Sequence, residues 1–215
     1  MEMSGTRSRP ADLTREKLVT AVLELIERDG ISAVTMKQLA CRIGCSTTAA
    51  YKHVLGKDEL LELAADRMIA QQLLPARSGQ HWTDQIRAIV QANLYLEDHH
   101  PWVSDVMLKR YENRGAETPN VRKGLDRTRE VLVRGGFSPR CAALGNALVS
   151  ATIIGLVVEA KYRSLRVSGD LPDAISEEEF RHCAIDTLVH GLQRLLTDNR
   201  KTAASERRAG RVTRG

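Results

Sequence analysis

The chain has 215 residues, of which 42% are hydrophobic and 27% are charged, a balance typical of a soluble globular protein with one or two domains. The net charge of +5 is unevenly distributed. Residues 1–57 carry nine Lys and Arg against six Asp and Glu, residues 58–197 carry seventeen against nineteen, and residues 198–215 carry six against two. A small basic module at the N-terminus indicates a polyanionic partner.

The composition argues against a secreted protein and against a membrane protein. Residues 1–17 lack the apolar segment of a secretory signal, so we expect a cytoplasmic location. The apolar run 141–158 is barely long enough to span a bilayer and contains three polar residues, which favours a buried core helix. The four cysteines show no CxxC pattern, which favours small buried side chains in a reducing compartment. Cys41 and Cys45, at helical spacing, leave a redox switch or half a metal site as the alternative.

Helical periodicity recurs from residue 13 onward, and no segment alternates as a half-buried strand does, so we predict an all-α protein. The first helix follows Thr14, which is a predicted N-cap, and ends at Gly30. In the second helix, Thr35 and Gln38 form a predicted capping box, and Gly44 ends the helix.

The segment that follows Gly44 has few apolar residues. Ser46 is its predicted N-cap, and Ala50 and Val54 are its only candidates for an inward-facing side chain. Two short helices joined by a turn that begins with glycine are typical of a helix-turn-helix (HTH). The outer face of the second helix, over residues 46–53, is then free to meet a polar partner.

The predicted domains follow from this pattern. Residues 1–12 are a flexible arm, residues 13–57 the HTH domain, and residues 57–74 a connecting helix that ends near Pro75. Residues 75–198 form a second helical domain, and residues 199–215 are predicted to be a basic disordered tail. The tail is either a solubilising segment or a non-specific DNA-binding arm.

The helix after Pro139 is apolar on every side. A stripe of small residues would let another helix approach closely: Ala143, Ala147, Ala151 and Gly155. We predict that Leu144, Leu148 and Leu156 lie on the opposite face. The most economical cover is the same helix pair of a second copy, in a homodimeric four-helix bundle. The predicted interface also includes Leu188, Leu192 and Leu195 of the last helix, and the alternative is a central helix covered within one chain.

The run from Asp29 to Met68 resembles the N-terminal domain of tetracycline-repressor-like (TetR) transcriptional regulators. The residues that carry the resemblance are Gly30, Thr35, Leu39–Ala40, Gly44, Ser46, Tyr51, His53 and Lys57. Cys45, Ala50 and Val54 depart from the family's usual Val, Leu and Phe, and these changes thin the packing behind the second HTH helix. Close coverage extends over residues 13–70, and the remainder matches in helical plan and length.

The resemblance implies a two-fold dimer whose second HTH helix enters the major groove of double-stranded DNA at a palindromic operator. It assigns DNA contacts to Thr35, Lys37, Ser46, Thr47, Thr48, Ala49, Tyr51, Lys52, His53 and Lys57. Hydroxyls, a cation and free amides at these positions suit phosphates or base edges, and the methyl groups suit thymine. Because Lys and Thr face the groove, we expect much of the affinity to come from phosphates and to fall steeply with salt. The alternative for His53 is a purely structural role.

The resemblance also implies a small-molecule effector in the second domain and release from DNA when it binds. The candidate effector-binding residues are Trp82, Tyr95, His99, Trp102, Met107 and Tyr111. We predict no cofactor and no metal, since the adjacent His99 and His100 point in different directions. No nucleophile elbow or phosphate-binding glycine loop argues for an enzyme. The alternative is an HTH regulator whose C-terminal half only dimerises or binds a protein partner.

Overall fold

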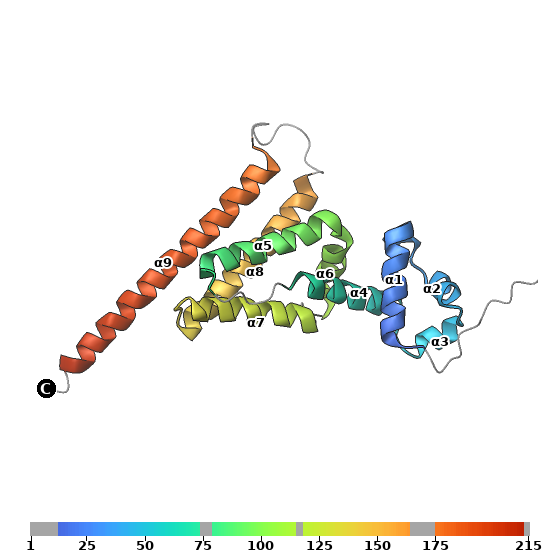
Figure 1. Cartoon of the computed structure of the whole chain (residues 1–215), viewed down its shortest axis with the longest axis horizontal. Coiled ribbons are helices and arrows are strands. Elements are labelled where there is room, and N and C mark those ends of the chain that lie inside the picture. The colour runs from blue at the N-terminus through green and yellow to red at the C-terminus, as the bar shows by residue number, and fades with distance from the viewer. Residues whose placement is uncertain (1–12, 74–78, 115–117, 164–174, 213–215) are drawn as a thin grey trace, which may run out of the picture. The chain divides into compact units, whose positions relative to one another are not determined.

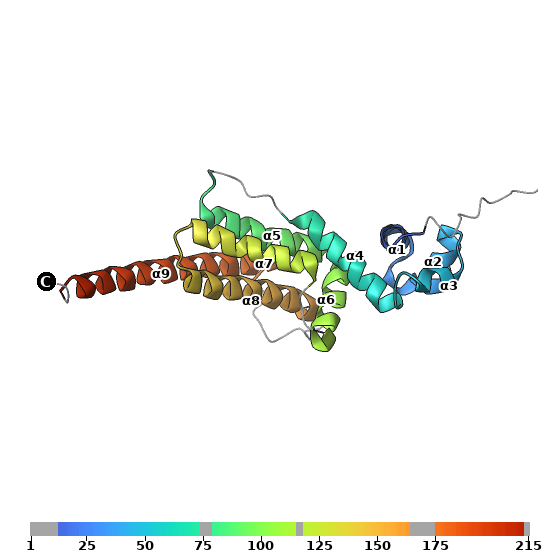
Figure 2. The ribbon, with the colours of Figure 1, turned by 90° about the horizontal axis from the view of Figure 1, so that it is seen from below.

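The computed structural model describes residues 13–73, 79–114, 118–163 and 175–212. These residues form helices joined by turns, with no strand among them, so the predicted all-α class is confirmed. The helices are shown in Figures 1 and 2 and divide into two compact units, each described here by itself. Unit 1 comprises Met1–Gln71 and His100–Val121, and unit 2 comprises Gln72–His99 and Arg122–Gly215.

Unit 1 begins with helices whose ends the sequence specifies locally. Its elements are α1 (Arg15–Asp29), the 3-10 helix η2 (Ile31–Ala33), α2 (Met36–Ile43), α3 (Thr47–Tyr51), α4 (Lys57–Gln72) and α6 (Pro101–Arg114). The Thr14 hydroxyl accepts a hydrogen bond from the Lys17 amide at 3.2 Å and so caps α1. Gly30, with φ of 79°, ends that helix in a conformation that other residues rarely adopt. Both predicted signals therefore act where expected.

The core of unit 1 is made of Leu, Val and Ala side chains. Its fully buried members come from α1, α2, α3, α4 and the link before α2, and include Leu18, Val22, Leu25, Val34, Leu39, Ala50, Leu60, Ala64 and Ala65. Ala50 and Val54 are 0% and 2% exposed, so both residues predicted to face inward from the third helix do so. Small side chains at these points let α3 lie close to α2.

Helix α6 is joined by ion pairs to α4 in unit 1, whereas the sequence assigns it to the second domain. Arg110 Nη1 lies 2.8 Å from Glu62 Oε2, and each side chain is only 17% exposed. Lys109 Nζ lies 3.3 Å from Asp58 Oδ2. The predicted boundary at residue 75 therefore differs from the observed division, in which residues 100–121 belong to unit 1. The sequence could not indicate this, because ion pairs between residues about fifty positions apart leave no local pattern.

The buried carboxylate of Asp66 in α4 caps the N-terminus of another helix, α7 (Pro119–Arg134). Asp66, 9% exposed, accepts hydrogen bonds from the Thr118 hydroxyl, from the Asn120 amide at 3.0 Å and from Asn120 Nδ2 at 2.8 Å. A carboxylate is favoured at a helix N-terminus because the free amides there are partly positive. The first turn of α7 is thereby held against α4.

Unit 2 has one apolar core. It is built by α5 (Trp82–His99), α7, α8 (Pro139–Arg163) and α9 (Glu177–Val212). The core cluster includes Ile86 and Val90 of α5, Leu132 of α7, Val149 of α8 and Leu192 of α9. Helix α9 packs along α8 and contacts α5 as well.

Two of the predicted dimer residues lie in this core. Leu188 is 9% exposed and Leu192 is 0% exposed, while Leu195 is partly buried against the same cluster. Leu188 and Leu192 therefore pack inside their own chain, which differs from the prediction that they face a second copy, whereas the interface role of Leu195 stays a prediction. Periodicity identifies an apolar face but not the helix that covers it.

The predicted small-residue stripe on α8 is exposed: Ala143, Ala147, Ala151 and Gly155. Leu144 and Leu148 are 52% and 43% exposed and lie beside this stripe, not opposite to it, while Leu156 is buried at 5%. The prediction for Leu144 and Leu148 is therefore corrected. We call the seven exposed apolar residues of α8 the α8 face: Ala143, Leu144, Ala147, Leu148, Ala151, Ile154 and Gly155.

The segment Pro139–Tyr162 of α8 is long and apolar enough to cross a membrane by length and composition alone. Core helices of soluble proteins pass the same test, and Ala142 and Val149 of this helix are 0% and 1% exposed within unit 2. The helix thus has one face in the core and one face uncovered.

Helix α9 continues to Val212, whereas we predicted a disordered tail from residue 199. Figures 1 and 2 both show its C-terminal part running beyond the other helices of unit 2. The segment 199–212 is rich in Ala, Arg, Lys and Glu, which are strong helix formers. The helix-forming residues of 199–212 therefore extend α9 beyond its apolar, core-facing part.

An ion pair joins the end of α5 to the start of α9. The guanidinium of Arg181 forms two hydrogen bonds of 2.7 Å with the Asp98 carboxylate, and these bonds hold the pKa of Asp98 below its usual value. The lowered pKa adds stability above the unfolded-state value of about 4, and this contribution is lost as the pH falls through the folded-state pKa.

We expect Asp98→Asn to lower the free energy of unfolding at pH 7 by less than about 1 kcal/mol, because the Asp98 side chain is 42% exposed and solvent screens the pair. The difference between parent and variant should shrink steadily below about pH 4. Thermal unfolding of both proteins between pH 7 and pH 2.5 measures it. A difference that stayed constant over this range would contradict the assignment.

Candidate nucleic-acid interface

The turn between α2 and α3 has the geometry of an HTH. Gly44 adopts the left-handed conformation with φ of 75°, and its amide bonds to the Cys41 carbonyl at 3.2 Å. The Cys45 amide bonds to the Ala40 carbonyl at 3.0 Å, which closes the end of α2. The Ser46 hydroxyl then accepts from the Ala49 amide at 3.1 Å and starts α3. The predicted turn and cap are thus both present.

The second HTH helix is shorter than we predicted. Helix α3 spans Thr47–Tyr51, and the predicted segment was 46–53. The Lys52 amide bonds to the Ala49 carbonyl at 3.3 Å and the His53 amide to the Ala50 carbonyl at 3.0 Å, so the chain tightens into i,i+3 turns after Tyr51. His53 therefore lies on a turn that leads into α4.

The residues with predicted DNA contacts differ in exposure. Six of them are exposed: Thr35, Lys37, Ser46, Thr48, Tyr51 and Lys52. Four are half-buried: Thr47, Ala49, His53 and Lys57. Tyr51, 52% exposed, is one of the most exposed large aromatic side chains among the described residues. All ten lie in unit 1, on α2 and its N-cap, on α3 and the turns beside it, or at the first residue of α4.

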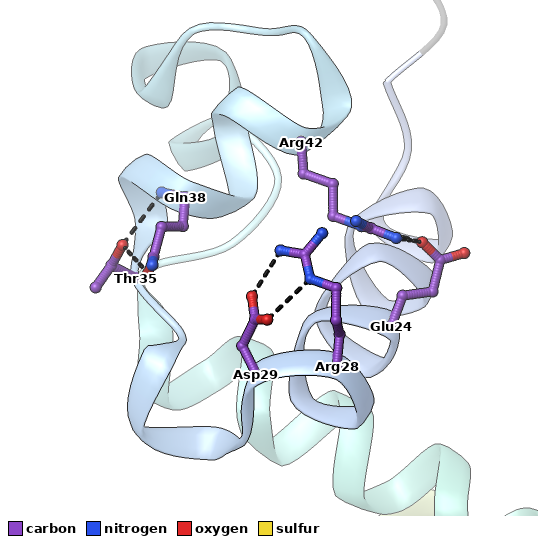
Figure 3. Close-up of polar contacts among 6 residues, drawn as sticks. All are labelled: Glu24, Arg28, Asp29, Thr35, Gln38 and Arg42. Atoms are coloured by element: carbon purple, nitrogen blue, oxygen red, sulfur yellow. Dashed lines mark hydrogen bonds and ion pairs between the residues drawn. The ribbon is translucent and has the colours of Figure 1, made fainter.

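The cations of this region fall into two groups. Lys37, Lys52 and Lys57 make no ion pair with any carboxylate in the described part of the chain. Arg42, by contrast, places Nη2 2.7 Å from Glu24 Oε2 and so joins α2 to α1, as Figure 3 shows. The three predicted lysines are therefore unpaired cations among the described residues, as is the exposed Lys17 of α1.

Arg28 belongs to the paired group. Its Nε and Nη2 atoms lie 2.9 and 2.6 Å from the two oxygens of Asp29, the next residue (Figure 3). The hydrogen bond from Arg28 is the main reason why the pKa of Asp29 lies below its usual value, and the nearby Arg42 adds to it. This guanidinium is committed within its own helix.

The Thr35 hydroxyl has two partners inside the protein. It accepts from the Gln38 amide at 3.1 Å and donates to Gln38 Oε1 at 2.9 Å (Figure 3). The N-cap half of the predicted capping box is present, but the Gln38 side chain bonds to the Thr35 hydroxyl and not to the Thr35 backbone N–H. Because its hydrogen is already donated, Thr35 can offer a DNA partner only the remaining lone pair of its oxygen.

Comparison with known proteins identifies relatives of this HTH chain. No family model matches. The chain is 32% identical over 152 residues to an HTH-type transcriptional regulator of Saccharopolyspora erythraea, a match that covers 71% of this chain and 62% of that protein. It is 35% identical over 80 residues to the tetracycline repressor protein class D of Escherichia coli, covering 36% of each. The chain thus matches about three-fifths and one-third of these relatives.

The fold agrees with these matches. The structure of the Streptomyces coelicolor TetR family protein ActR in complex with actinorhodin covers 86% of this chain and 98% of its own, with a TM-score of 0.68 and 20% identity. The chain is therefore similar in sequence to HTH-type transcriptional regulators and shares the fold of TetR-family proteins.

The six predicted effector residues do not gather in one unit. Trp82, Tyr95 and His99 lie on α5 in unit 2, while Trp102, Met107 and Tyr111 lie on α6 in unit 1. Unit 1 has open hollows of about 1270 Å³ and 750 Å³, and none of the six residues lines either one. Their role in effector binding stays a prediction.

Trp82 packs inside unit 2. It is 8% exposed, meets Phe137 edge-on with ring centroids 5.1 Å apart, and lies so close to Gly135 that a β-carbon there would approach its ring to 2.8 Å. Tyr95 is 52% exposed and stacks on His99 with centroids 3.9 Å apart. Trp82 thus fills the core, and the Tyr95–His99 pair lies at the surface.

Asn146 on α8 was not among the predicted site residues. It is 7% exposed in the core of unit 2, and its Oδ1 atom has no hydrogen-bond partner among the described residues. It shares a helical stripe with Ala142 and Val149, which are both in the core cluster. An unsatisfied buried amide oxygen is costly, on the order of 1–3 kcal/mol. The asparagine within an apolar run was the only signal in the sequence.

Within the part of the chain that the structure describes, no group of three or more His, Cys, Asp or Glu could hold a metal ion. Cys41, Cys45, Cys141 and Cys183 are free thiols. Two of them, Cys41 and Cys183, are exposed, which differs from the predicted buried positions.

Proposed function

We propose that the protein is a homodimeric repressor that binds a palindromic operator through α2 and α3 and is released when a small molecule binds its C-terminal helices. The observation that carries the DNA-binding part is the set of unpaired lysines, Lys37, Lys52 and Lys57, which flank the exposed Tyr51 and Thr48. Double-stranded DNA is the partner that suits a short, poorly apolar helix surrounded by uncompensated positive charge.

The proposed chemistry divides between positioning and readout. Lys52, Lys57 and the Tyr51 hydroxyl donate to phosphates, which fixes the register of the protein on the duplex. Lys37 suits either a phosphate or a guanine edge, and the methyl groups of Thr48 and Ala49 suit the thymine methyl. Ser46 and Thr47 add hydroxyl donors at the start of α3, and His53 adds an imidazole N–H.

Titration of the protein with the DNA upstream of its own gene, at several salt concentrations, tests this proposal. Three lysines from each of two protomers predict a slope of log K against log [salt] of about −5. A scrambled duplex of the same length is the control, and the upstream DNA should bind at least about 1,000-fold more tightly. Equal affinity for both duplexes at every salt concentration would refute sequence-specific binding.

The α8 face supports the homodimer. It presents Leu144, Leu148 and Ile154, each more than 40% exposed, beside the small-residue stripe. A β-carbon added at Gly155 would meet no atom of the described residues within 4 Å, so packing among those residues does not explain this glycine within the helix. Close approach of a helix from a second copy explains both the exposed leucines and the glycine.

The effector is proposed to be a small, largely apolar molecule with at least one hydrogen-bonding group. The apolar core of unit 2 and the unpaired oxygen of Asn146 suit such a molecule. A related fold, ActR, has been solved in complex with actinorhodin. The packing of Trp82 into the core favours the alternative, in which the C-terminal helices only dimerise.

A thermal-shift screen of small hydrophobic molecules separates the two alternatives. A ligand present at 100 times its dissociation constant stabilises the fold by about 2.7 kcal/mol, and a true effector should also release the operator. A molecule that raises the melting temperature and leaves DNA affinity unchanged would support the effector-free alternative.

We propose a cytoplasmic location, because the proposed DNA partner is found in the cytoplasm.

A further inference from the structure

Arg15, in the first turn of α1, makes contacts to the segment that joins α3 to α4. Its Nε atom donates to the His53 carbonyl at 3.1 Å, and its Nη2 atom donates to Glu59 Oε1 at 3.1 Å. The other oxygen of Glu59 accepts from the Leu55 amide. The Arg15 guanidinium and the Glu59 carboxylate thus connect both ends of the segment 53–59. We call these three hydrogen bonds, from Arg15 to His53, from Arg15 to Glu59 and from Leu55 to Glu59, the bracket.

Between α3 and α4 this segment has few apolar side-chain contacts, and apart from the Arg15 and Glu59 bonds its start is held by backbone bonds from the His53 and Val54 amides to the Ala50 carbonyl. Val54 is buried at 2%, but Leu55 is 82% exposed and Gly56 has no side chain. The segment nevertheless carries His53 and leads to Lys57, two of the proposed DNA contacts. A surface held by few apolar contacts depends on its polar contacts for its position.

The charge of Arg15 is already balanced where it lies. Glu59 is its ion-pair partner at 3.1 Å, and the carboxylate is the more buried of the two, with 18% of its side chain exposed against 55% for Arg15. A planar guanidinium can donate to two acceptors at once, which the single nitrogen of lysine cannot do in the same geometry. Arg15 therefore acts more through the two directed hydrogen bonds of its guanidinium than through its net charge.

We infer that Arg15 is a positioning residue for operator binding: through the bracket it sets the place of His53 and Lys57 relative to α3. It does not itself contact phosphate. This inference rests on the proposed DNA-binding function. It concerns a residue of α1, outside the HTH segment that was assigned to DNA.

The test compares Arg15→Lys with Arg15→Gln in operator titrations at several salt concentrations. Because both variants lose the bracket, both should weaken binding by about threefold to twentyfold in the two-fold dimer. The salt slope of both should match that of the parent. If Arg15 bound phosphate directly, Arg15→Lys would retain parent affinity and Arg15→Gln would reduce the slope by about 2, and this result would overturn the inference.

Two further variants complete the experiment. Arg28→Lys alters another forked arginine of α1, one that is bonded only to the adjacent Asp29, and should leave operator affinity within about twofold of the parent. Glu59→Gln should weaken binding as Arg15→Gln does, and the double variant should be no weaker than either single one, because both act on the same bracket. Additive losses in the double variant would also overturn the inference.

Amide hydrogen exchange gives a readout that needs no DNA. In Arg15→Lys the amide of Leu55 should exchange faster than in the parent, while the amides of α2 should be unchanged. If the parent itself does not prefer its upstream DNA, the proposed function fails. If the parent binds and Arg15→Lys binds equally well with unchanged exchange, only the positioning role fails.

Discussion

Replacing Tyr51 and Lys57 together by alanine is expected to weaken operator binding by at least about 100-fold. The two residues contribute a phenol hydroxyl and an ammonium in each protomer, so the dimer loses four proposed phosphate contacts, each worth on the order of 1 kcal/mol or more. Loss of two lysines should also reduce the magnitude of the salt slope by about 2. Fluorescence anisotropy with the upstream duplex measures both quantities.

The fold should survive this double change. The Tyr51 side chain is 52% exposed, and Lys57 makes no ion pair among the described residues, so neither supports the core of unit 1. Arg134→Ala is the control, because it removes an exposed cation of unit 2 that pairs only with Glu130. We expect this control to bind as the parent does. A double variant with parent affinity and slope would refute the proposed DNA surface.

The second large effect is expected from Leu148→Asp. Leu148 lies in the α8 face with 43% of its surface exposed, so a carboxylate there is tolerated in the isolated protomer. In the proposed dimer the substitution occurs twice and places two unpaired charges in an apolar interface, which costs several kcal/mol. We expect the dimer dissociation constant to rise by at least about 100-fold. Sedimentation velocity at micromolar concentration should then show a monomer.

Operator affinity should fall with dimerisation, since each monomer offers only one HTH to a two-fold symmetric site. Val133→Asp provides the matched control: Val133 is 47% exposed on α7 and lies outside the α8 face. That variant should remain dimeric and keep operator affinity. A dimeric Leu148→Asp protein with an unchanged melting temperature would rule out the α8 face as the interface.

The HTH was predictable because its signals are local. Thr14, Thr35 and Ser46 each cap the helix that follows them, and Gly44 adopts the left-handed turn that the HTH requires. Each of these interactions spans three or four residues, so residue type and spacing are sufficient to predict it. The end of α3 was less predictable, because i,i+3 turns after Tyr51 have no strong residue preference.

The apolar faces of the C-terminal helices show what spacing cannot decide. Leu188 and Leu192 on α9 and Leu144 and Leu148 on α8 have similar apolar periodicity, yet the first two are in the core and the last two are exposed. Which face a helix buries depends on the helices that pack beside it, and these come from distant parts of the chain. The same reason limits the prediction of effector residues. The sequence shows where the aromatic residues lie along the chain but not which side chains pack around them.

The sequence by itself determined the all-α class, the HTH with its turn and caps, and the residues that surround α3. Only the tertiary structure decided which cations are free to meet DNA. Lys37, Lys52 and Lys57 remain unpaired, whereas Arg15 and Arg42 are bonded to glutamates 44 and 18 positions away. The physical reason is that caps and turns are set by neighbours along the chain, while charge pairing and burial are set by neighbours in space.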